Sequence, residues 1–163
     1  MNYAKIVPCD IANGPGVRVT LFCAGCNHHC PGCQNPQTWN AAAGIPFVED
    51  TMQELLDLLR PNYIRGLTFS GGDPLFVQNR LIVGYICERV RKEFGDAKDI
   101  WMWTGYEWDD IKDWDHLHYI DALVDGPYIE AEHDISLPWA GSKNQRVIDV
   151  KKSLERGEVV LWK

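Results

Sequence analysis

Cysteines crowd one short segment of the chain, Cys23-Ala-Gly-Cys26-Asn-His-His-Cys30-Pro-Gly-Cys33. Thiolates are soft ligands that select zinc, copper(I) or iron–sulfur clusters. Structural zinc sites usually place two Cys-x-x-Cys pairs about 12 to 20 residues apart, whereas only three residues separate the two pairs here. A ferredoxin-type electron carrier uses four cysteines in a different order of spacers. The segment therefore favours an iron–sulfur cluster, with a zinc site as the open alternative.

The chemistry of the six cysteines also depends on where the protein works. The N-terminus has neither a basic start nor a continuous apolar run, so it reads as mature sequence without a secretory signal. No stretch approaches the roughly 20 apolar residues that span a bilayer. We therefore expect a cytoplasmic protein with no membrane partner, in which cysteines are thiols or metal ligands and form no disulfides. Cys87 falls in an expected helix and is interpreted as a buried, inert thiol.

Length and charge limit the remaining possibilities. The 163 residues, 45% of them hydrophobic, suffice for one globular domain over residues 1–163. The formal net charge is −7 and Lys and Arg form no long run. Nucleic-acid binding is disfavoured, because it depends on cationic side chains that release counterions. The expected partners are small molecules or a protein surface.

Strand-like and helix-like segments alternate along the chain. Alternating β-branched residues predict a strand over 17–22 that runs directly into the cysteines. A capping box of Thr51 with Glu54 predicts the start of a helix that Pro61 ends. A second helix is expected over 79–94, with one apolar face made of Leu81, Ile82, Tyr85, Ile86, Val90 and Phe94. Further strands are expected over 67–70, 100–103 and 119–124, and a short helix over 108–114.

This alternation predicts an α/β fold in which parallel strands are joined by right-handed crossovers. Ligands of such sheets collect at the carboxyl ends of the strands. The cysteines, Gly71-Gly72-Asp73-Pro74, Trp103-Thr104-Gly105-Tyr106 and Val124-Asp125-Gly126 all follow expected strands and should share one rim. A complete βα barrel takes about 250 residues, so we expect an incomplete parallel barrel with an open side. Residues 127–163 are expected to form an irregular loop over the rim and a late strand over 158–162.

Taken as Cys26-x-x-x-Cys30-x-x-Cys33, the segment resembles the motif of the radical S-adenosylmethionine (SAM) enzymes. Other segments resemble, more narrowly, the family that activates anaerobic (class III) ribonucleotide reductase. They are NGPGVRVTLF before the cysteines and NPQTW, SGGDPL, DIWMWTGY, LVDGPY and GSKNQR after them. The resemblance extends from about residue 13 to residue 146.

The resemblance implies a set of ligands. Cys26, Cys30 and Cys33 would bind three irons of a [4Fe-4S] cluster and leave the fourth iron to SAM. The backbone of Gly71, Gly72 and Asp73 would hold the methionine part of SAM. Many family members carry an aromatic residue beside the third cysteine, where this chain has Gly32 and Gln34. Backbone contacts from Gly32, Cys33 and Gln34 would then hold the adenine. Cys23 is expected to be a bystander, so that Cys23→Ser keeps the cluster.

The resemblance also implies an activity, that of a radical SAM oxidoreductase. One electron from the reduced cluster cleaves SAM, and the resulting 5′-deoxyadenosyl radical takes a hydrogen atom from a glycine of the reductase large subunit. A flavodoxin or ferredoxin would supply the electron. His28 and His29 are interpreted as solvated loop histidines, and Asp125 either meets the cofactor or finishes a turn. The alternatives are activation of another glycyl radical enzyme, a radical SAM reaction on a small molecule, or a zinc-binding interaction module.

Overall fold

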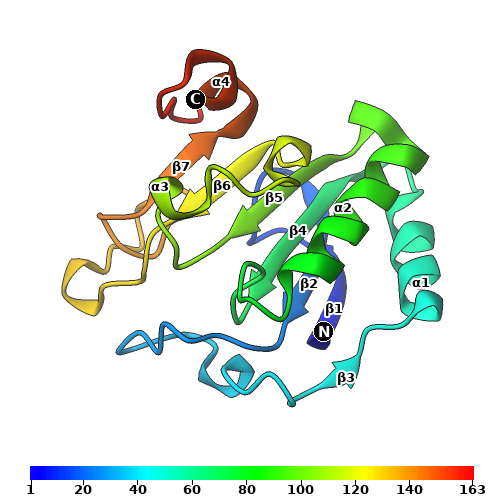
Figure 1. Cartoon of the computed structure of the whole chain (residues 1–163), viewed down its shortest axis with the longest axis horizontal. Coiled ribbons are helices and arrows are strands. Elements are labelled where there is room, and N and C mark those ends of the chain that lie inside the picture. The colour runs from blue at the N-terminus through cyan, green and yellow to red at the C-terminus, as the bar shows by residue number, and fades with distance from the viewer.

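The computed structural model describes all residues, 1–163, and contains one seven-stranded sheet of order β3-β1-β2-β4-β5-β6-β7 (Figure 1). Its strands are β1 (Asn2–Asp10), β2 (Val17–Cys23), β3 (Ile45–Pro46), β4 (Ile64–Gly71), β5 (Asp99–Trp103), β6 (Ala122–Asp125) and β7 (Arg146–Asp149). The α-helices are α1 (Glu49–Leu59), α2 (Arg80–Phe94), α3 (Trp108–Ile111) and α4 (Val150–Arg156). Short 3-10 helices occupy Pro36–Thr38, Gly95–Ala97, Leu117–Tyr119 and Glu130–Glu132. No helix has both the length and the apolar character needed to cross a membrane.

The middle of the sheet is parallel, which confirms the α/β class. Strands β2, β4, β5 and β6 pair in parallel, so their carboxyl ends lie at the same edge. The flanking strands β1, β3 and β7 pair antiparallel, and the architecture is therefore a mixed sheet. Strands β1 and β3 were not expected. The sequence of β1, NYAKIVPCD, contains Pro8 and lacks regular alternation, and register shifts interrupt its pairing with β2.

The C-terminal part differs most from the sequence-based expectation. Strand β7 and helix α4 occupy residues that were expected to be irregular. The side chain of Asp149 accepts a hydrogen bond from the N–H of Lys152, and Gly157, at φ 69°, ends the helix. The strand expected over 158–162 is wrong, because only Leu161 forms a single bridge there, to Ile148.

The helices also correct several details. Thr51 is the third residue of α1, where its Oγ accepts the N–H of Val48 at 3.4 Å, so the capping box of Thr51 with Glu54 is wrong. Helix α3 ends at Ile111, earlier than expected. In α2 the buried residues are Val83, Gly84, Ile86, Cys87 and Val90, whereas Leu81 is 77% exposed. Leu81 lies two residues before Val83, about 200° around the helix, and so faces away from the core.

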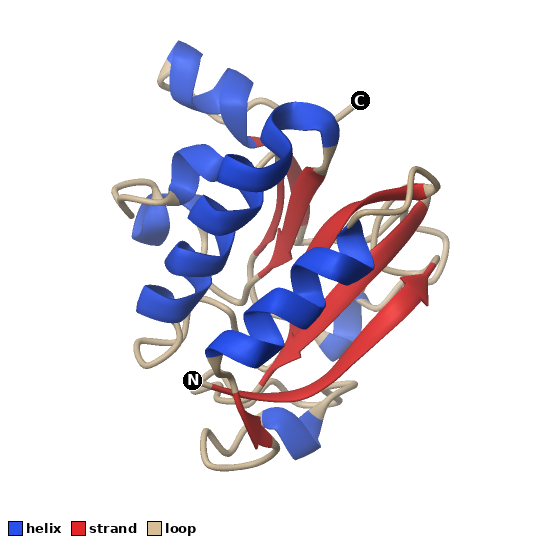
Figure 2. Ribbon diagram, turned by 90° about the vertical axis from the view of Figure 1, so that its right-hand side faces the viewer, coloured by secondary structure: helices blue, strands red, loops and turns tan.

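Helices α1 and α2 pack on one face of the sheet (Figure 2). This face carries alternate residues of the central strands, including Val19, Leu21, Leu67, Phe69, Ile100 and Met102, all of them buried. The intervening residues point to the second face. There Thr20, Thr68, Trp101 and Ala122 form one row across β2, β4, β5 and β6.

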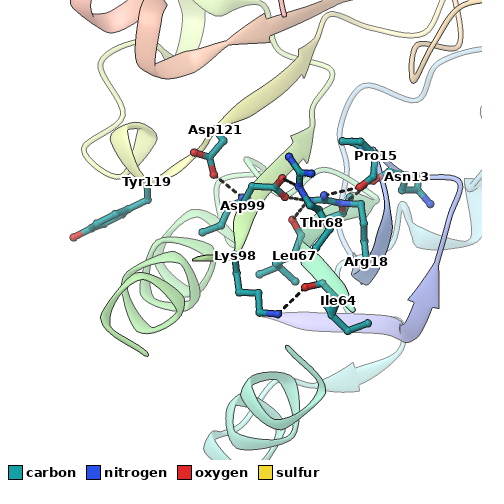
Figure 3. A network of polar contacts seen from close by, with 12 residues as sticks. Asn13, Pro15, Arg18, Ile64, Leu67, Thr68, Lys98, Asp99, Tyr119 and Asp121 are labelled. Atoms are coloured by element: carbon teal, nitrogen blue, oxygen red, sulfur yellow. Dashed lines mark hydrogen bonds and ion pairs between the residues drawn. The ribbon is translucent and has the colours of Figure 1, made fainter. Parts of the chain in front are cut away.

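Arg18 is fully buried on the second face, near the amino end of β2 (Figure 3). Its guanidinium donates to Thr68 Oγ1 at 2.7 Å and to the carbonyls of Leu67 and Pro15 at 2.9 and 3.2 Å. Its Nη2 lies 2.6 Å from Asp99 Oδ1, a close ion pair although the angle is not that of a hydrogen bond. Arg18 thus joins β2, β4, β5 and the loop before β2, at the end of the sheet opposite the cysteines.

The segment that ends β6 and the segment that leads into β7 are joined by hydrogen bonds. Asp125, at the end of β6, is buried and accepts hydrogen bonds from the side chain of Arg146 and from the N–H of Trp108. Asn144 Nδ2 donates to the carbonyl of Pro127 at 2.7 Å, and Gln145 Nε2 donates to that of Gly126 at 3.0 Å. Of the two interpretations of Asp125, the structure supports the one in which it completes a turn.

Candidate functional site

The cysteine loop leaves the carboxyl end of β2. Cys26, Cys30 and Cys33 are partly exposed free thiols on this one loop. The loop is tightly wound: the N–H of Cys33 donates to the carbonyl of Cys30 at 3.1 Å, and His29 and Gly32 adopt the left-handed conformation with φ of 48° and 72°. No three His, Cys, Asp or Glu side chains stand in the arrangement of a site for a single metal ion. The three cysteines thus share one short segment, and their side chains are not gathered around a common centre in this structure.

Backbone N–H groups lie close to the sulfurs of Cys26 and Cys33. Burial raises the pKa of the Cys26 thiol, and hydrogen bonds from the N–H groups of His28 and His29 act in the opposite direction. The N–H of Asn35 donates to Cys33 Sγ at 3.4 Å. Hydrogen bonds to the sulfurs are one of the ways in which proteins tune iron–sulfur clusters. The donors present therefore fit thiolates that carry a cluster.

The other cysteines differ from these three in their surroundings. Cys23, the last residue of β2, and Cys87, in α2, are fully buried, and burial raises the pKa of both thiols well above the ordinary range. Cys87 is thus the buried thiol that the sequence predicts. Cys9 is exposed on β1, away from the loop in sequence. A buried thiol that resists ionisation is a poor metal ligand, because the thiolate is the binding form.

The turn Gly71-Gly72-Asp73 follows β4 and is bonded directly to the beginning of the cysteine loop. The N–H of Gly72 donates to the carbonyl of Cys23, and the N–H of Asp73 donates to that of Gly25, both at 2.8 Å. Gly71 has φ of 99°, and a Cβ there would lie 2.7 Å from the carbonyl oxygen of Cys23. The glycines therefore allow the turn to pack against the loop. The carbonyl of Gly72 accepts no hydrogen bond within the chain.

Gly72→Ala should separate the turn from the loop, because a Cβ at this position would lie 2.5 Å from the carbonyl oxygen of Gly25 and 2.9 Å from that of Thr38. We expect stability to fall by about 1–3 kcal/mol, the usual cost of overpacking. Anaerobic urea unfolding would measure the loss. Gly141→Ala is the matched control, since a Cβ there meets no atom closer than 3.2 Å. Equal stability of the two variants would contradict the packing role of Gly72.

The side chain of Asp73 points into the protein and is only 1% exposed. Its carboxylate accepts the N–H groups of Leu75 and Gly105 and the hydroxyl of Thr104, at 2.8 to 3.0 Å. It also lies 2.8 Å from Nε2 of His28. Asp73 thus joins the ends of β4 and β5 to the cysteine loop. The sequence places Thr104 and Gly105 only in a segment that follows a strand. No sequence pattern indicates that they bind Asp73.

Gly32 and Gln34 lie exposed on the cysteine loop, on either side of Cys33. A Cβ at Gly32 would lie 2.7 Å from Oε1 of Glu130, so a carboxylate from the segment after β6 borders the loop. This neighbour was missed, because nothing in the sequence links residue 130 to residue 32. The segment after β6 thus reaches the rim that the cysteines and the glycine turn share (Figure 1).

Comparisons with known proteins identify the class to which the chain belongs. The family model described as a 4Fe-4S single cluster domain matches residues 12–148, which include the loop, the turn and every parallel strand. The chain is therefore a member of an iron–sulfur protein class.

Three curated relatives narrow this class, and each is described as an anaerobic ribonucleoside-triphosphate reductase-activating protein. That of Enterobacteria phage T4 is 48% identical over 147 residues, 90% of this chain and 93% of the relative. The relative from Haemophilus influenzae is 44% identical, and the match covers 89% of this chain and 96% of the relative. The relative from Escherichia coli K12 is 42% identical, and the match covers 90% of this chain and 97% of the relative. The chain belongs to the family of anaerobic ribonucleoside-triphosphate reductase-activating proteins.

Proposed function

We propose that this protein activates an anaerobic ribonucleotide reductase by generating a glycyl radical on its large subunit. The observation that carries the proposal is the junction of the three-cysteine loop with the glycine turn at the carboxyl ends of β2 and β4. A flavodoxin- or ferredoxin-type protein is the expected electron donor. When bound, a reduced [4Fe-4S] cluster would supply one-electron chemistry, namely the reductive cleavage of SAM that releases methionine and leads to hydrogen-atom abstraction from the glycine.

The residues of the chain divide the work of holding these groups. Cys26, Cys30 and Cys33 would bind three irons, and the N–H groups near the sulfurs would stabilise the thiolates. The unpartnered carbonyl of Gly72 would accept from the amino group of SAM. The backbone from Gly32 to Gln34 would contact the adenine, on the exposed side of the loop. We also propose that the mixed sheet is an incomplete barrel of the radical SAM type, with its open side toward the reductase.

The direct test is to combine reduced, cluster-loaded protein, SAM and an anaerobic reductase without oxygen. Electron paramagnetic resonance should show a glycyl radical doublet that depends on SAM. Metal analysis of the same sample should give about four irons per chain. A colourless protein with one tetrahedral zinc would instead support the zinc-binding alternative. Absence of the doublet with a competent reductase, while SAM is still cleaved, would direct the search to another glycyl radical enzyme.

A further inference from the structure

His28 lies between two of the candidate ligands, and its ring is held from several sides. Nε2 lies 2.8 Å from Oδ2 of Asp73, and the side chain is 18% exposed. The ring meets that of Tyr106 edge to face, with centroids 4.6 Å apart. Gly105 packs so closely that a Cβ there would lie 2.5 Å from the ring. The expectation of a solvated histidine is therefore wrong for His28, because residues that follow β4 and β5 pack around its ring.

Asp73, the partner of His28, is itself buried and held by hydrogen bonds. Apart from His28, the Asp73 carboxylate binds two backbone N–H groups and the buried hydroxyl of Thr104. These bonds hold the carboxylate in one orientation relative to the glycine turn. A contact to this carboxylate consequently fixes any loop residue that makes it.

The neighbours of His28 make no such contact. His29 is exposed and its ring packs on that of Trp39, with centroids 4.7 Å apart. Asn27 is exposed and its Oδ1 lies 3.4 Å from the hydroxyl of Tyr106. The backbone bonds from the turn reach Cys23 and Gly25, which precede the first ligand. Between Cys26 and Cys30, His28 is therefore the residue whose side chain binds the glycine turn.

We propose that His28 is a positioning residue, which holds the Cys26–Cys30 segment against the Gly71-Gly72-Asp73 turn and thereby sets the affinity for SAM. The inference rests on the proposed function, in which SAM contacts both the cluster and the turn. A ligand that is held at two points binds tightly only when the two points are already fixed relative to each other. Otherwise the entropic cost of ordering the protein offsets part of the binding free energy. Replacing a residue that orients a metal ligand without binding the metal itself typically lowers metal affinity or activity 10- to 100-fold.

The test compares His28→Ala with His28→Gln, and Asn27→Ala, at an exposed position, is the control in the same loop. Each variant is reconstituted anaerobically, its iron is counted, and the electron paramagnetic resonance of the reduced cluster is titrated with SAM. We expect His28→Ala to keep about four irons and to need on the order of tenfold more SAM for the SAM-induced spectral change. His28→Gln should recover part of the loss, since its amide can donate to Asp73. Asn27→Ala should resemble the wild type.

An unchanged SAM titration in His28→Ala would overturn the proposal, as would equal weakening in Asn27→Ala. Loss of iron from both His28 variants would also overturn it, because His28 would then serve cluster binding instead of SAM positioning. A wild-type chain whose cluster responds to SAM but makes no glycyl radical would contradict the proposed function alone. A wild-type chain that loads no cluster would overturn both.

Discussion

Replacing Cys26, Cys30 or Cys33 by serine, one at a time, is expected to abolish glycyl radical formation. Each substitution removes one of the three proposed protein ligands, and a serine hydroxyl is a harder and much less acidic ligand than a thiol. After anaerobic reconstitution, each variant should contain well below the wild-type content of about four irons per chain. Iron analysis and the absorbance of the brown cluster measure the loss, and electron paramagnetic resonance measures the radical.

Two other cysteines provide the controls. Cys9→Ser alters an exposed thiol on β1, and Cys23→Ala alters a buried thiol three residues before Cys26. Alanine suits the buried position, because a serine hydroxyl would need a hydrogen-bond partner there. Both controls should retain iron and activity. Iron loss in Cys23→Ala, together with retention in Cys33→Ser, would show that the set of ligands is wrongly assigned.

Arg18→Met is expected to destabilise the protein by about 2–5 kcal/mol, because buried acceptors lose a charged donor at about 1–3 kcal/mol each, while Asp99 is partly exposed and keeps Arg65 as a partner. Methionine keeps much of the side-chain volume, but the carbonyls of Leu67 and Pro15 and the hydroxyl of Thr68 lose their donor. The hydroxyl of Thr68 also donates to the carbonyl of Asn13 at 2.7 Å, so the loop before β2 should loosen as well. The midpoint of anaerobic urea unfolding measures the change.

Arg65→Met is the matched control for Arg18→Met. Arg65 binds the other oxygen of the same carboxylate, Asp99 Oδ2, at 2.9 Å, but its side chain is 58% exposed. An exposed ion pair contributes about 0–1 kcal/mol, so Arg65→Met should unfold close to the wild type. Similar losses in the two variants would mean that the charge of Asp99 matters and that burial of Arg18 does not.

The central fold was predictable because its elements are regular. Strands β4 and β5 and helix α2 were placed within a few residues, since apolar runs and a glycine stop mark them. The expected α/β class followed from their alternation. The antiparallel strand β1 was not predictable, because its sequence contains Pro8 and lacks regular alternation. Strand β7 was not predictable, because a long irregular segment separates it from its partner β6. Helix α4 is only seven residues long and depends on Asp149 and Gly157 at its ends.

The candidate site was predictable in its chemistry and not in its contacts. Spacing alone singled out the cysteine loop, and the turn signal singled out Gly71, Gly72 and Asp73. The sequence could not show that Asp73 turns inward to His28 and Thr104, or that Glu130 borders Gly32, since these contacts join distant segments. Likewise, NGPG and GSKNQR supply structural contacts around Arg18 and Asp125.

The three candidate ligands contribute nothing to the apolar core, which is built from strands and helices on either side of their loop. Losing the cluster to oxygen should therefore disorder a local stretch and leave the sheet standing, in contrast to a small zinc finger that collapses without its metal. Hydrogen exchange in the cluster-free protein should be fast over residues 26–35 and slow in β4 and β5. A cell returning from air to anoxia would then need only to repair the cluster, without making the polypeptide again.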